Sequence, residues 1–142
     1  MSLETWMESK GYLMEDINYQ GDYGYTALMR AAKDGEVEIV REILGQDGLD
    51  LNITNVDGNN ALWNGCFADS EPIVKMLIEA GIAIDAINDN GVTALMYTAS
   101  TGKEAMTRML LEAGADRTIQ NVDGFTALDL ASTRTIVKML RS

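Results

Sequence analysis

Gly24-Tyr25-Thr26-Ala27-Leu28 opens a pattern that occurs four times in the 142-residue chain. The form Gly-x-(Thr/Asn)-Ala-Leu stands at residues 24–28, 58–62, 91–95 and 124–128, at intervals of 34, 33 and 33 residues. A fixed period of this length indicates an array of structural repeats, in which each unit buries its apolar face against its neighbours. The recurrence therefore predicts an array that spans residues 22–142.

Each repeat is expected to form two helices. The Thr or Asn before the first apolar residue is a typical helix N-cap, because its side-chain oxygen accepts a hydrogen bond from a free backbone N–H group. Glycine at Gly35 and Gly102 is expected to end the first helix, where a positive φ is needed. Paired apolar residues four positions apart, such as Ile39-Val40 and Ile43-Leu44, predict a second helix with one buried face.

The repeats resemble the ankyrin repeat, which has a 33-residue period and a T-P-L-H-x-A motif. The motif stands here as Thr26-Ala27-Leu28-Met29-Arg30-Ala31, and Glu112-Ala113-Gly114-Ala115-Asp116 is similar to the family's x-x-G-A-D. The resemblance implies an all-α fold, a solenoid of helix-turn-helix units joined by β-turn or hairpin-like loops.

The chain departs from the family motif at two positions. The proline is alanine in all four repeats, so the first helical residue lacks a preset φ. The histidine position is Met29, Trp63, Met96 or Asp129, and the chain contains no histidine. An apolar row at this position predicts packing where the family uses hydrogen bonds within the motif.

The chain is expected to form a single domain, residues 1–142. Residues 1–21 are predicted to be an N-terminal capping half-unit, with a helix over Leu3 to Ser9. Full repeats are expected at 22–54, 55–87 and 88–120. A shortened capping repeat is expected at 121–142, where Ile136-Val137 arrives three residues early.

The net charge of −11 is concentrated in the first part of the chain. Residues 1–87 hold 5 basic and 16 acidic side chains, whereas residues 88–142 hold 6 of each. Nucleic acid and anionic membrane surfaces are therefore not expected as partners, and a basic partner would be steered favourably towards this part of the chain. The acidic residues are expected first of all to be solvated helix faces that keep the protein soluble. With Cys66 as the one cysteine, no intrachain disulfide forms, and a cytoplasmic protein is expected.

No catalytic site, metal site or cofactor is expected. Zinc favours Cys and His ligands. The chain has one cysteine and no histidine. Cys66 occupies a position expected to be buried, and serines such as Ser70 have no histidine base. If residues 85–91 formed a calcium loop, its last ligand would be Tyr97, which cannot chelate the ion.

The family resemblance implies a concave groove lined by the turn tips and the exposed face of each first helix. The residues that map onto this groove are Tyr23, Tyr25, Lys33, Asp34, Val56, Asp57, Asn59, Phe67, Asp89, Asn90, Val92, Ser100 and Phe125. Aromatic side chains at such positions are typical interface anchors. For Tyr23 and Tyr25, packing against adjacent tips remains an equal alternative, whereas Phe67 is expected to be exposed and Trp63 partly buried.

The leading hypothesis is a non-catalytic module that binds a protein or peptide through this groove, as a monomer. One alternative is a scaffold or homo-oligomer that uses the same groove on itself. A second is a small-ligand binder or enzyme, which would need a deep pocket with convergent polar groups.

Overall fold

Nine α-helices and one short 3₁₀ helix make up the computed structural model, which describes all residues, 1–142, and contains no strand. The prediction of an all-α fold is confirmed. The chain divides into unit 1, residues 1–82, and unit 2, residues 83–142. The single-domain organisation and the repeat boundaries stay a prediction. None of the helices has the length and apolar character needed to cross a bilayer.

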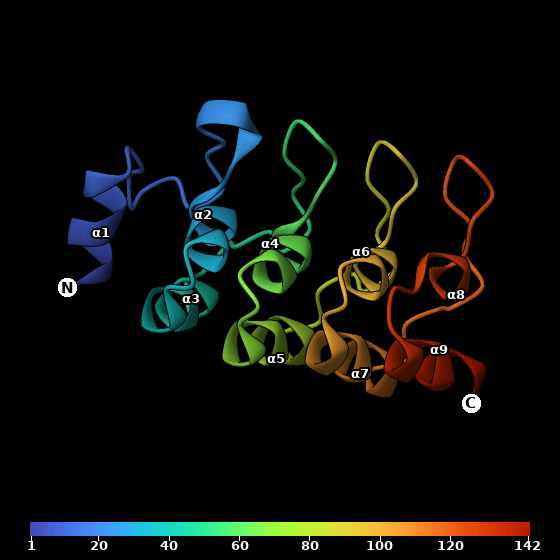
Figure 1. Cartoon of the computed structure of the whole chain (residues 1–142). Helices are drawn as coiled ribbons and strands as arrows, with labels where there is room; N and C mark the ends of the chain where they lie inside the picture. Colours follow the sequence, from blue (N-terminus) through green and yellow to red (C-terminus); the bar gives the residue numbers. More distant parts are fainter. The chain divides into compact units, whose positions relative to one another are not determined.

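Unit 1 contains five of the α-helices and the 3₁₀ helix (Figure 1). Their bounds are α1 (Leu3–Ser9), η1 (Asp22–Gly24), α2 (Ala27–Lys33), α3 (Val37–Leu44), α4 (Ala61–Phe67) and α5 (Glu71–Glu79). Unit 2 contains α6 (Ala94–Ser100), α7 (Glu104–Glu112), α8 (Ala127–Leu130) and α9 (Arg134–Arg141). The helix expected in the N-terminal half-unit has the bounds that the sequence predicts.

The first helix of each repeat begins at the predicted N-cap. Thr26 Oγ1 accepts a hydrogen bond of 3.2 Å from the Met29 N–H group, and Asn60 Oδ1 accepts one of 3.2 Å from Trp63. Each cap of this kind stabilises a helix by about 1 kcal/mol. The caps are therefore retained although the motif's histidine is absent.

In the last repeat, Asp129 occupies the family's histidine position and forms a capping box with Thr126. The Thr126 N–H group donates to Asp129 Oδ2 at 2.9 Å, and the Asp129 N–H group donates to Thr126 Oγ1 at 3.3 Å. This reciprocal pair satisfies two backbone donors at the start of the short helix α8.

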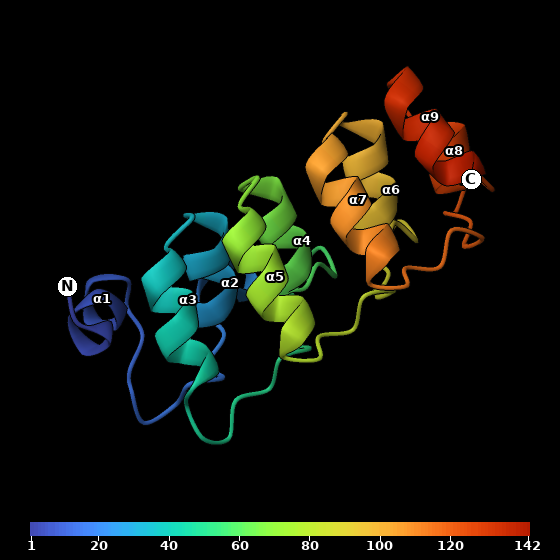
Figure 2. The same cartoon turned by 90° about the horizontal axis from the view of Figure 1, so that it is seen from below.

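Within unit 1, α2 packs against α3 and α4, α4 packs against α5, and α3 lies beside α5 (Figure 2). The core contains fully buried side chains such as Ile43, Leu62 and Leu77. Gly65 is needed for close packing of α4 on α5, because a Cβ atom there would lie 3.1 Å from Ile73 Cγ2. The neighbouring Cys66 is fully buried, as the sequence predicts.

Within unit 2, α6 packs against α7 and α8, and α9 packs against both α7 and α8. Leu95, Leu110 and Ile136 are buried in this core. Arg117 Nη1 donates hydrogen bonds of 3.1 Å to the Leu140 carbonyl and 3.0 Å to the Ser142 carbonyl. Since the last carbonyls of a helix lack partners within it, Arg117 caps the end of α9.

A loop precedes the first helix of each of the four repeats and projects away from the second helix of that repeat (Figure 1). We call the ends of these loops tip 1 (residues 21–25), tip 2 (55–59), tip 3 (88–92) and tip 4 (121–125). In unit 1 the Val56 N–H group donates to the Tyr23 carbonyl at 2.9 Å. Gly24 permits this contact, because a Cβ atom on it would lie 3.1 Å from the Val56 nitrogen. Tips 1 and 2 are thus joined by a hydrogen bond between backbone groups.

Candidate functional site

The candidate residues of unit 1 lie on its tips and at the ends of α2 and α4. Tyr23 is 76% exposed and Phe67 48% exposed, while Tyr25 is half-buried. Asn59, at 8% exposure, is buried and offers little surface to a partner. We call the remaining candidate residues of unit 1 the unit 1 face. Trp63 is included in this face because it packs on Phe67. Its members are Tyr23, Tyr25, Lys33, Asp34, Val56, Asp57, Trp63 and Phe67.

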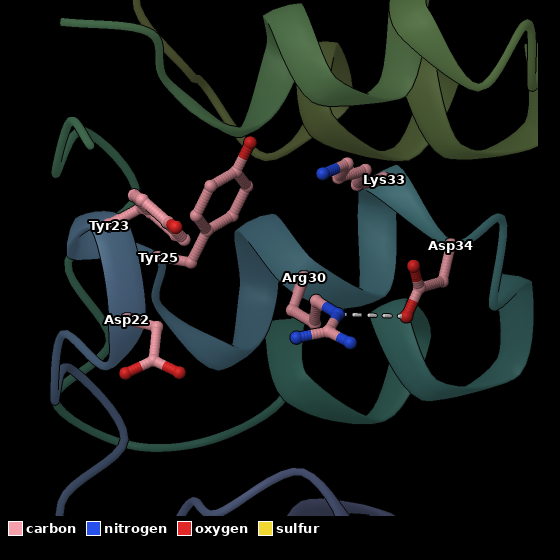
Figure 3. Close-up of a pocket in the computed structure, with 6 residues that line it drawn as sticks. All are labelled: Asp22, Tyr23, Tyr25, Arg30, Lys33 and Asp34. Atoms are coloured by element: carbon pink, nitrogen blue, oxygen red, sulfur yellow. Dashed lines mark hydrogen bonds and ion pairs between the residues drawn. The ribbon is translucent and has the colours of Figure 1, made fainter. Parts of the chain in front are cut away.

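An open pocket of about 270 Å³ lies between tip 1 and α2 (Figure 3). Its lining residues are Asp22, Tyr23, Tyr25, Arg30, Lys33 and Asp34. Figure 3 shows the ring of Tyr25 between Tyr23 and the end of Lys33, with Arg30 turned towards Asp34. The pocket is therefore aromatic on one side and carries charges of both signs on the other.

Both cations of this pocket are engaged by neighbouring side chains. Arg30 Nε lies 3.2 Å from Asp34 Oδ2, in an ion pair four residues apart on one helix. Lys33 Nζ lies 5.0 Å from the centroid of the Tyr25 ring, which is a cation–π contact. This contact holds the half-buried ring of Tyr25 against α2.

The acidic side chains of the two tips are not engaged in this way. Asp22 and Asp57 are both exposed, and neither carboxylate makes a hydrogen bond or ion pair in the structure. The backbone N–H group of Asp57 does donate to Asn55 Oδ1, at 3.0 Å, which orders tip 2. The uncompensated charge at these tips is thus negative.

Trp63 and Phe67 form the aromatic part of α4 on this face. Their ring centroids are 6.1 Å apart and their planes are inclined by 11°, which is a stacked arrangement. Trp63 is partly buried, as the sequence predicts, and Phe67 is exposed. Stacking one ring on the other limits the rotamers of Phe67, so less conformational entropy is lost when a partner covers it.

Tyr12, from the N-terminal half-unit, supports this face from below tip 1. Tyr12 is 3% exposed, and its hydroxyl group donates to the Tyr25 carbonyl at 2.9 Å. Burial raises the pKa of Tyr12 above its ordinary value, and the nearby Arg30 guanidinium opposes part of this shift. The phenol, which like any tyrosine is protonated at neutral pH, therefore releases its proton only at a higher pH than an exposed tyrosine does.

The candidate residues of unit 2 form a less aromatic set. Asp89, Asn90 and Ser100 are exposed, and Val92 is half-buried. Phe125, 49% exposed, is the aromatic member, and its N–H group donates to Asn121 Oδ1 at 3.0 Å. Unit 2 also differs in charge, because residues 83–142 carry −1 and residues 1–82 carry −10.

Arg30 is a pocket residue that the sequence reasoning did not include. Its position is held by Asn64 in the next repeat and by Tyr97 in the third, so the repeat pattern alone does not mark it. The available signal was the spacing of Arg30 and Asp34, since residues four apart on a helix face each other.

Comparisons with known proteins agree with the repeat geometry. A family model described as "Ankyrin repeats (3 copies)" matches residues 9–88 and 66–142. The chain belongs to the ankyrin-repeat family. The predicted ankyrin-repeat fold is thereby confirmed, and the family's fold is generally a non-enzymatic scaffold for protein–protein interactions.

A solved structure similar to this ankyrin-repeat chain is the ankyrin repeat domain of Bcl-3, described as a unique member of the IκB protein family. The TM-score is 0.84 and the sequence identity 27%, over 93% of this chain and 57% of the Bcl-3 chain. The ankyrin-repeat chain thus spans little more than half the length of that relative. No curated protein matches it. Ankyrin repeats in general indicate protein partners.

Proposed function

We propose that the chain is a non-catalytic module that binds a protein or peptide partner through its groove surface, and that the unit 1 face dominates the affinity. The observation that carries this proposal is the aromatic content of that face. Tyr23 and Phe67 are exposed, Tyr25 is held by Lys33, and Phe67 stacks on Trp63. Aromatic side chains of this kind supply most of the binding energy at interfaces.

The groove residues of unit 2 take a secondary part in this proposal. Phe125, Asp89, Asn90, Val92 and Ser100 would add contacts of lower aromatic content. The partner is proposed to be basic, because residues 1–82 hold 15 acidic and 5 basic side chains. Complementary charge increases the rate of association, and salt screens it.

The proposal includes a monomeric state and a cytoplasmic location. Cys66 is fully buried, so it is not placed to form an intermolecular disulfide, and a reducing compartment suits such a thiol. A monomer leaves the unit 1 face open to a different protein. Sedimentation equilibrium tests this point, since a dimer that dissociates on Phe67→Ala would show instead that the face binds a second copy.

The binding function is tested by affinity capture from the native host, followed by calorimetry with the purified partner. The variant is the double substitution Tyr25→Ala and Phe67→Ala, and the matched control is Tyr19→Ala. Tyr19 is 49% exposed but lies outside the groove set. We expect the double variant to weaken binding by at least about tenfold, since truncating one interface anchor costs about 1–2 kcal/mol or more. Equal affinities for the double variant and the wild type would overturn the proposal.

A further inference from the structure

Tip 1 differs in conformation from tip 2, which lies beside it. In tip 2, Asn55 Oδ1 accepts hydrogen bonds from the N–H groups of Asp57 and Asn59. Gly21 stands at the equivalent position of tip 1 and has no side chain to accept them. Tip 1 closes instead as the 3₁₀ helix η1, with the Tyr25 N–H group donating to the Asp22 carbonyl at 3.2 Å.

This closure places Tyr23 in the left-handed region, at φ 57° and ψ 19°. A bulky aromatic residue is rarely found there, because its Cβ atom crowds the backbone. Gln20 supports the conformation, since its Nε2 donates to the Gly24 carbonyl at 2.9 Å and to the Thr54 carbonyl at 2.8 Å. Strained residues held by their surroundings cluster at binding sites. Tip 1 thus holds an exposed tyrosine in a conformation that its own backbone disfavours.

Tips 1 and 2 together present two carboxylates and two exposed apolar side chains. We call this surface the tip pair, and its members are Asp22, Tyr23, Val56 and Asp57. The backbone bond from the Val56 N–H group to the Tyr23 carbonyl joins the two halves. Tyr23 is 76% exposed and Val56 60% exposed, and neither carboxylate is engaged.

The charge of the surroundings determines which partner this surface suits. Of the cations beside tip 1, Arg30 is ion-paired with Asp34, whereas Lys33 lies over the neutral Tyr25 ring and keeps its charge. The side chains of the tip pair itself carry two negative charges and no positive one, on a unit whose net charge is −10. A cationic side chain is attracted by both a carboxylate and the face of an aromatic ring. An acidic segment would be repelled.

We propose that the tip pair binds a basic segment of the partner, whose arginine and lysine side chains are attracted by the carboxylates of Asp22 and Asp57 and by the exposed ring of Tyr23. The inference rests on the proposed function and adds to it the place on the chain where the basic part of the partner binds. Unit 2 offers an internal comparison, because the Val122 N–H group donates to the Asn90 carbonyl in the same way, at 3.1 Å. Its tips carry Asp89 and Asp123 but no tyrosine.

The test is a titration of the isotope-labelled full chain with a short arginine–glycine repeat peptide, followed by backbone amide NMR shifts. We expect saturable shifts at residues 22–25 and 56–58 and smaller ones at 89–91 and 122–124. A glutamate–glycine peptide of equal length should cause none. Shifts of equal size at both pairs of tips, no saturation, or equal binding of the acidic peptide would each overturn the inference.

Matched variants distinguish binding at the tip pair from attraction of the peptide by the net charge of the chain. Asp22→Asn with Asp57→Asn should weaken peptide binding by about threefold or more, since each exposed ion pair contributes up to about 1 kcal/mol. Asp89→Asn with Asp123→Asn makes the same change of charge in unit 2 and should leave the affinity unchanged. Equal losses in the two double variants would contradict the assignment.

The two proposals fail in different ways. If the peptide does not prefer the tip pair but the Tyr25 and Phe67 double variant still weakens the natural partner, only the inference about the basic segment is lost. If the peptide binds the tip pair while that double variant leaves the natural partner unaffected, the unit 1 face is not the partner's main binding surface.

Discussion

The hydroxyl group of Tyr12 lies 2.9 Å from the carbonyl oxygen of Tyr25 and donates a hydrogen bond to it, which joins the N-terminal half-unit to tip 1. Tyr12 also packs against Gly21, where an added Cβ atom would lie 3.5 Å from the hydroxyl oxygen. The half-unit therefore supports the tip that carries Tyr23, as well as covering the end of the core.

Tyr12→Phe should lower the free energy of unfolding by about 0.5–1.5 kcal/mol at pH 7, the usual net contribution of one hydrogen bond. The loss stays moderate because the Tyr25 carbonyl still accepts from the Gly21 N–H group at 2.8 Å. Urea denaturation of both proteins measures the difference.

The hydrogen bond between Tyr12 and Tyr25 also predicts that the free energy of unfolding depends on pH in the alkaline range. Burial raises the folded-state pKa of Tyr12 above the ordinary value of 10.0, so the unfolded state releases this proton first. The stabilising contribution is complete below pH 10 and is lost as the pH rises through the folded-state pKa. The stability difference between the wild type and Tyr12→Phe should therefore shrink as the pH rises above 10.0. A difference that stays constant would contradict this assignment.

Ala27→Pro and Ala94→Pro should each raise the melting temperature by a few degrees. Both residues open a helix, and the residues before them, Thr26 and Thr93, have the extended backbone that a following proline requires. A compatible proline stabilises a protein by about 0.4–1 kcal/mol through the unfolded state. Differential scanning calorimetry measures the change. A clear fall in the melting temperature would show that the ring does not fit beside the buried neighbours.

Substitutions at Tyr23 should reveal the backbone strain of tip 1. Tyr23→Asn is expected to raise the free energy of unfolding by about 0.5–1 kcal/mol, because asparagine tolerates the left-handed region. Tyr23→Val should lower it, since a β-branched residue is disfavoured there. Chemical denaturation of the two variants and the wild type provides the comparison. If the two substitutions have the same effect, Tyr23 is not strained.

Charge reversal at Asp34 and Asp57 should slow association with a basic partner and weaken the salt dependence of its rate. The physical reason is electrostatic steering, which acts mainly on the association rate. Stopped-flow measurements at several salt concentrations test this, and Asp123→Lys in unit 2 serves as the control for Asp57→Lys. Unchanged association rates in the double variant would exclude the electrostatic part of the account.

The elements that local sequence determines were predictable. Thr26 and Asn60 cap helices because their side-chain oxygens lie three residues before a free N–H group. Gly35 ends α2 with φ 71°, as the repeat pattern requires. Cys66 is buried because its position recurs as a small residue between packed helices.

The features that were not predicted depend on what fills a position when the expected residue is absent. Against the family motif, Asp129 marks only the loss of a histidine, although Thr126-x-x-Asp129 resembles the spacing of a capping box. Tip 1 could not be predicted, because its conformation follows from the missing side chain at Gly21 together with Gln20 and Tyr12. The exposure of Phe67 was predicted from its repeat position, but its stacking on Trp63 needed the structure.

The most direct test of the central claim is hydrogen–deuterium exchange of the full chain with and without its purified partner. The account predicts protection on binding at residues 22–25, 55–59 and 63–68, with the second helices α3 and α5 unchanged. Protection confined to α3 and α5, with tips 1 and 2 exchanging as in the free protein, would contradict it.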